Sequence, residues 1–200
     1  MLGAIRYNLS HLLDFSGRDA RGTFWFYVLF LYLLNMAIAM VLGFVLVASI
    51  VSTVVDAAQT GASEQVVQSQ MAARMSGFMG SILGYSLVSN AIMVVLLAAS
   101  FVRRLHDSNK SGWWGLLVLA AQVAGSVVAF RMIDVMQDFM ADAMSRTTPM
   151  SPFEMQSMMQ SHNISLYSAI GWIGPLAVIV FGVLDSTKGP NRYGAEPVRF

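Results

Sequence analysis

Four long stretches of the sequence contain no Asp, Glu, Lys or Arg. They cover residues 22–55, 75–102, 111–130 and 155–184. A helix needs about 20 consecutive, mostly apolar residues to cross the hydrocarbon core of a bilayer, and each stretch can hold one. Charged residues make up 12% of the 200 residues, about half of the roughly 25% that is usual in soluble domains. The sequence therefore predicts an integral membrane protein.

The predicted fold class is all-α, in a single membrane domain over residues 1–200. We expect a four-helix bundle in the membrane, with amphipathic helical extensions outside it. The predicted spans are about 24–50, 82–102, 112–131 and 165–185, and the predicted outward segments are 56–80 and 132–163.

The basic residues are distributed unevenly between the loops. Nine of the twelve Lys and Arg residues lie in 1–21, 103–110 and 185–200. Loops on the cytoplasmic side of a membrane carry an excess of Lys and Arg. We therefore expect both termini to be cytoplasmic.

The second outward segment has a regular pattern. Met recurs every four residues from Met132 to Met144, and Asp recurs with the same period from Asp134 to Asp142. This spacing predicts an amphipathic helix with an apolar and an acidic stripe. Thioethers are soft ligands that suit Cu(I), and methionine also fills irregular packing gaps well. Metal contact and simple packing both remain possible interpretations.

Three polar segments flank the predicted spans at the basic end. The first reads F-S-G-R-x-x-R-x-x-F-W from Phe15 to Trp25, the second R-R-L-H-D-x-x-K-S-G-W-W from Arg103 to Trp114, and the third G-x-N-R-Y-G from Gly189 to Gly194. In the first, Arg18 and Arg21 are three residues apart, which predicts one face of a first helical turn.

The three motifs, in this order around four spans, resemble the family known as domain of unknown function 805. The resemblance implies a small bacterial inner-membrane protein and supplies no biochemical activity. The outward segments 56–80 and 131–163 are longer and richer in Met than the usual connections of that family, so the resemblance implies nothing about their role.

The polar residues of the three segments are interpreted as a folded cytoplasmic cap, in which Arg–Asp pairs tie the segments together. Such a cap can hold a lipid headgroup, an anionic ligand or a partner protein. The alternative is that the basic residues only set orientation and reach lipid phosphates. The candidate contact residues are Arg18, Arg21, Trp25, Arg103, Arg104, His106, Asp107, Lys110, Trp113, Trp114, Asn191, Arg192 and Tyr193.

No motif for catalysis or cofactor binding is found in the sequence. His106 and Asp107 invite a catalytic or metal interpretation, but adjacent residues on a helix rarely point at one another. We therefore expect no enzyme activity, no catalytic residues, no metal site and no cofactor. The net charge of +1 and the lack of a basic run argue against nucleic-acid binding.

The expected partners are membrane lipids, with a membrane-protein partner or a homo-oligomer also possible. The favoured function is a non-enzymatic membrane protein that presents the cap. The second candidate is an accessory or oligomeric component of membrane transport, with Met-rich metal contact on its outer side.

Overall fold

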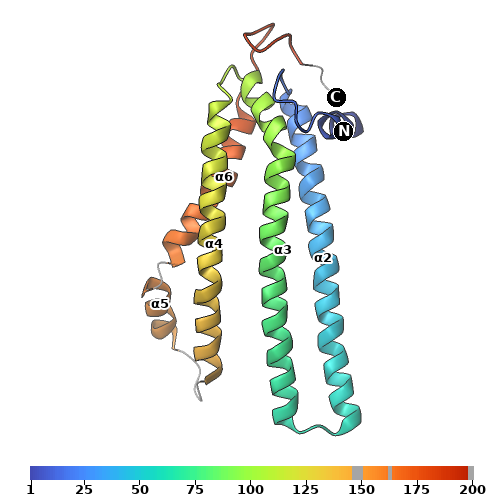
Figure 1. The fold of residues 1–200 in the computed structure, drawn as a ribbon, viewed down its shortest axis with the longest axis vertical. Helices are drawn as coiled ribbons and strands as arrows, with labels where there is room; N and C mark the ends of the chain where they lie inside the picture. Colours follow the sequence, from blue (N-terminus) through green and yellow to red (C-terminus); the bar gives the residue numbers. More distant parts are fainter. Residues whose placement is uncertain (146–150, 162–163, 198–200) are drawn as a thin grey trace. The chain divides into compact units, whose positions relative to one another are not determined.

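The computed structural model describes residues 1–145, 151–161 and 164–197. Within these ranges it leaves undescribed the side chains of residues 75, 76, 79, 132–145, 155, 158, 159, 161, 164–168, 170 and 171. The elements are six helices (Figure 1): α1 Leu2–Ser10, α2 Arg21–Thr60, α3 Glu64–Asp107, α4 Trp113–Ser145, α5 Pro152–Ser161 and α6 Ile164–Val183.

Among the described residues, three segments are long and apolar enough to cross a membrane: Arg21–Thr60, Gly80–Asp107 and Trp113–Arg131. The described stretch Trp172–Val183 of α6 is apolar but shorter. The prediction of an all-helical protein with helices able to span a membrane is confirmed for the described residues, and the four-helix bundle stays a prediction. The helices form because lipid offers no hydrogen-bond partner to the backbone, so each span must satisfy its own N–H and C=O groups.

The predicted outward segment 56–80 is the end of α2, a short turn and the beginning of α3. α2 ends because Gly61 adopts a φ of +62°, a left-handed conformation that glycine takes without steric cost. The amide of Ala62 then donates to the carbonyl of Ala57 over 3.2 Å, which satisfies one of the free carbonyls of the last turn.

The predicted outward segment 132–163 contains the end of α4, which continues to Ser145, and the separate helix α5. The side chains of Met132 to Met144, on which the predicted apolar and acidic stripes depend, lie outside the described residues. The two interpretations of the methionines therefore stay as predictions.

The chain divides into two compact units: Met1–Tyr27 with Val94–Phe200, and Val28–Met93. The second unit is a helical hairpin of α2 and α3. The two helices are joined by polar contacts, because the Asn35 amide donates to the Ser89 hydroxyl and the Tyr85 hydroxyl donates to the Asn35 carbonyl over 2.9 Å. In an apolar setting such bonds stabilise helix association where the hydrophobic effect does not.

In the first unit, α6 packs against α4 (Figure 1) and ends against the first turns of α2. A Cβ atom added to Gly182 would lie 2.8 Å from Cε1 of Phe24 and 2.8 Å from Cζ2 of Trp25. The two rings therefore require glycine at this place in α6.

We expect Gly182→Ala to lower the free energy of unfolding in detergent by about 1–3 kcal/mol, the usual cost of overpacking. The matched control is Gly43→Ala, because Gly43 also lies in a helix and has nothing within 4 Å of its ideal Cβ position. The control should leave the free energy unchanged or raise it slightly. Equal effects of the two substitutions would contradict the close packing at Gly182.

Candidate functional site

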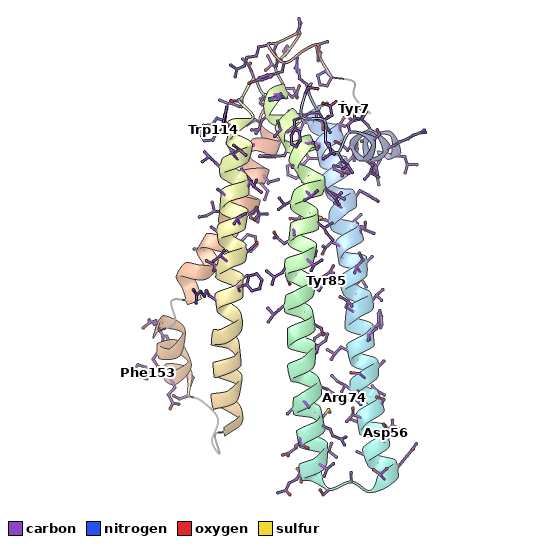
Figure 2. All side chains as sticks on the ribbon, in the orientation of Figure 1. Tyr7, Asp56, Arg74, Tyr85, Trp114 and Phe153 are labelled. Carbon is purple, nitrogen blue, oxygen red and sulfur yellow. The ribbon has the colours of Figure 1, made fainter. Side chains whose placement is uncertain are left out.

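The three polar motifs meet at one end of the first unit. The loop between α1 and α2, the end of α3 and the segment after α6 all contribute side chains or carbonyls to it. Figure 2 shows Tyr7 of α1 and Trp114 of α4 at this end. The site is built around two buried carboxylates.

Asp107 binds two arginines at once. Its Oδ1 accepts hydrogen bonds from Nη2 and Nε of Arg18 at 2.9 and 3.1 Å, and its Oδ2 accepts one from Nη1 of Arg104 at 2.5 Å. The three side chains are at most 1% exposed. A carboxylate with charged donors on both oxygens is among the stronger polar arrangements in proteins.

Asp19 is the second buried carboxylate. Its Oδ1 accepts from Nε of Arg103 at 3.2 Å, and its Oδ2 accepts from the Ser100 hydroxyl at 2.9 Å. Burial raises the pKa of the Asp19 carboxyl, whereas the Arg103 guanidinium and the Ser100 hydroxyl act in the opposite direction. Arg18, Asp19, Arg103, Arg104 and Asp107 are called the buried ion network below.

Backbone carbonyls take up further arginine donors. Arg18 donates to Thr187 at 2.6 Å, to Gly189 at 2.7 Å and to Gly194 at 3.3 Å. Arg103 donates to the carbonyls of His11, at 2.8 Å, and of Asp14, and to Oδ1 of Asn8 at 2.6 Å. A buried charge is tolerated when it is paired and its remaining hydrogen-bonding groups are satisfied. These guanidinium groups meet that condition.

The end of α6 is capped by residues of two other helices. Trp25 and Arg104 both donate to the carbonyl of Gly182, at 3.1 and 3.2 Å. Arg104 also donates to Leu184, and Arg21 donates to Val183 at 3.3 Å. The last carbonyls of a helix have no partner within it, and they carry partial negative charge that cations stabilise. These donors satisfy the last carbonyls of α6, which ends at Val183, close to the predicted boundary at about 185.

The segment after α6 docks on the end of α3. The rings of His106 and Tyr193 stack with centroids 3.9 Å apart, and the Asn191 amide donates to the His106 carbonyl over 2.9 Å. On its other side, Nδ1 of His106 lies 3.2 Å from the carbonyl of Gly17. Gly17 has a φ of +81°, a backbone conformation that favours glycine.

Arg18 differs from the sequence prediction. The spacing predicted Arg18 and Arg21 on one face of a helix, whereas α2 begins at Arg21 and Arg18 lies in the loop before it. The prediction was wrong, because Gly17 turns the chain and Arg18 then points to Asp107 instead of along the helix. His106 and Asp107 also have different partners in the described contacts: the His106 ring contacts the Gly17 carbonyl, and Asp107 pairs with Arg18.

The thirteen candidate residues divide by exposure. Arg18, Arg103, Arg104 and Asp107 are buried, and Trp25, His106, Asn191 and Tyr193 are half-buried. The others are exposed: Arg21, Lys110, Trp113, Trp114 and Arg192. These five residues are called the basic–aromatic rim below. Among the thirteen candidates, the rim residues are the most open to an external ligand.

The thirteen candidates do not include Asp19 of the buried ion network. Two further residues of the site were not predicted from the sequence, Asn8 and Ser100. Both touch the buried ion network and are 1% exposed. Asn8 lies on α1, where Ala4, Ile5 and Asn8 form the buried face. Their spacing of three and four residues is typical of a helix, but the nine-residue segment is too short for the pattern to predict one. Ser100 lies in a predicted span and carried no signal.

A family model described as protein of unknown function (DUF805) matches residues 12–195. The chain belongs to this family. No curated protein and no solved structure matches the chain. All five residues of the buried ion network lie within the first two motifs recognised in the sequence. The third motif supplies the carbonyls of Gly189 and Gly194 that Arg18 binds.

We expect Asp107→Asn to lower the free energy of unfolding by about 3–5 kcal/mol, because it leaves two buried arginines without their anion. The control is Asp185→Asn, which removes the exposed ion pair with Arg21 and should cost less than about 1 kcal/mol. Chemical unfolding in detergent measures both. Similar losses for the two variants would contradict the conclusion that Asp107 stabilises the fold by pairing with two buried arginines.

Proposed function

We propose that this DUF805 protein is a non-enzymatic, multi-pass protein of the bacterial inner membrane that binds anionic phospholipid headgroups through its basic–aromatic rim. The observation that carries the proposal is the separation of buried from exposed charge. The buried ion network uses its arginines internally, whereas Lys110 and Arg192 are exposed beside two exposed tryptophans.

Contacts of Arg192 place its guanidinium beside the loop that carries Lys110. Nη2 of Arg192 donates to the carbonyl of Asn109 over 3.3 Å, so the guanidinium lies next to the residue that precedes Lys110. Its central carbon also lies 4.7 Å from the centroid of the Tyr193 ring. These contacts support a local cluster of positive charge suited to a phosphate group.

The aromatic residues of the rim support a place at the membrane surface. Trp113 and Trp114 form the beginning of α4 and are 74% and 46% exposed. Trp is enriched where the headgroups meet the hydrocarbon, because its ring is apolar and its N–H is polar. Lys110 is then at the height of the lipid phosphates.

The buried ion network supports the proposal as a scaffold. It joins the loop before α2, the end of α3 and the segment after α6 by ion pairs and carbonyl contacts. A binding surface works best when packed and hydrogen-bonded residues hold its ligating groups in place. A protein partner with an acidic surface would meet the same rim and is distinguished by the lipid experiment below.

The proposed orientation places both termini in the cytoplasm. The chain has no cysteine, so single-cysteine variants can be labelled without background. We expect a membrane-impermeant maleimide to reach Thr60→Cys from outside intact cells, and to reach Ser16→Cys and Lys188→Cys only after permeabilisation. All three positions are exposed. Labelling of Ser16→Cys from outside intact cells would contradict the proposed orientation.

Removing the charges of Lys110 and Arg192 from the rim should weaken the response to anionic lipid. We expect phosphatidylglycerol to raise the melting temperature of the purified protein more than phosphatidylcholine does. In the double variant Lys110→Gln, Arg192→Gln the affinity for phosphatidylglycerol should fall by about thirtyfold, since each basic residue near an anionic surface contributes about 1 kcal/mol.

The control for that experiment is the double variant Arg74→Gln, Arg131→Gln, which removes two exposed cations outside the cap. It should retain the response to phosphatidylglycerol. Equal weakening in both double variants would mean that net charge alone acts. No difference between the two lipids for the unaltered protein would reject headgroup binding and leave an acidic protein partner as the ligand of the rim.

A further inference from the structure

α1 has apolar residues on two sides. Ala4 and Ile5 are 0% and 8% exposed and face the rest of the first unit. Leu2 and Leu9 are 81% and 43% exposed, and their spacing of seven residues puts them on one other face. Leu13, in the turn after the helix, is 83% exposed. The described part of the protein leaves these three leucines, called the leucine face below, uncovered.

The height of α1 is fixed by Arg103. This arginine directly follows the charge-free stretch 75–102, so it lies where α3 leaves the hydrocarbon core. It binds Asn8 of α1 and the carbonyls of His11 and Asp14 just after that helix. α1 is therefore held at the level of the lipid headgroups.

The direction of α1 fits the same level. Figure 1 shows α1 at the end of the first unit where α2 begins, running across the direction of α4, a helix of the same unit. A helix that crosses the spans at headgroup height lies in the plane of the membrane surface. This is the placement of an interfacial helix, which buries an apolar face a few ångströms into the lipid.

The charge on α1 is also placed for lipid. Arg6 is exposed and lies four residues after Leu2 and three before Leu9, so it shares their side of the helix. An arginine beside an apolar stripe can bury its stem in the acyl region and extend its guanidinium to a phosphate. The leucine side chains match the apolar acyl chains of a leaflet, and the arginine matches its anionic phosphates.

From these observations we infer that α1 is an in-plane membrane helix, with Leu2, Leu9 and Leu13 in contact with acyl chains and Arg6 at the phosphates. The occupant of the leucine face is the bilayer itself. The inference goes beyond the proposed function, because the basic–aromatic rim contains no residue of α1 and can bind lipid whether or not α1 is inserted.

The experiment uses the full chain in vesicles of phosphatidylcholine and phosphatidylglycerol. Single-cysteine variants Leu9→Cys and Leu13→Cys are labelled with a nitroxide, and collision rates are measured with oxygen, which partitions into lipid, and with a water-soluble nickel complex. The control is Ser10→Cys, because Ser10 is exposed and follows Leu9 on a different side of the helix. Unchanged melting temperatures verify that the labelled variants are folded.

We expect the ratio of oxygen to nickel collisions to be several times higher at positions 9 and 13 than at position 10. An equal ratio at all three positions would place α1 in water and overturn the inference. Labels at 9 and 13 that are shielded from both reagents would also overturn it, because a protein surface would then cover the leucine face. None of these outcomes depends on the lipid response of the rim.

Discussion

The carboxylate of Asp107, shared between Arg18 and Arg104, is the interaction on which this end of the molecule depends. A charge removed from water costs several kcal/mol unless a counter-charge and further hydrogen bonds replace the water. Two arginines paired with one aspartate leave excess positive charge. The remaining guanidinium N–H groups donate to the carbonyls of Gly182, Leu184, Thr187 and Gly189. The path of the chain after α6 follows from that requirement.

The same residues that would orient the chain in a membrane are therefore also structural. Positive charge near the end of a span suffices for orientation, wherever the side chain points. Arg18, Arg103 and Arg104 instead have defined partners and almost no exposed surface. The exposed members of the candidate set form the basic–aromatic rim, and the buried ion network joins the segments that carry it.

The sequence was sufficient to predict the long helices, because lipid imposes a length and an absence of charge that can be counted directly. It also indicated that the arginines and aspartates of three separate segments would pair. It did not indicate which pairs form, since Arg18 reaches Asp107 only through the turn at Gly17. α1 was missed because nine residues carry too little periodicity, and Ser100 because a hydroxyl in an apolar run resembles any other small residue.

The contacts of Arg18 also bear on the order in which the protein is assembled. They join residue 18 to residue 107, 89 positions away, and to Gly189 and Gly194, 171 and 176 positions away. During synthesis, α2, α3 and α4 are complete long before those glycines leave the ribosome. Until the segment after α6 is made, the Arg18 guanidinium lacks its three carbonyl acceptors, Thr187, Gly189 and Gly194. The C-terminal segment thus acts as the closing piece of the fold, and a chain that stops short of it leaves Arg18 incompletely bonded at the membrane surface.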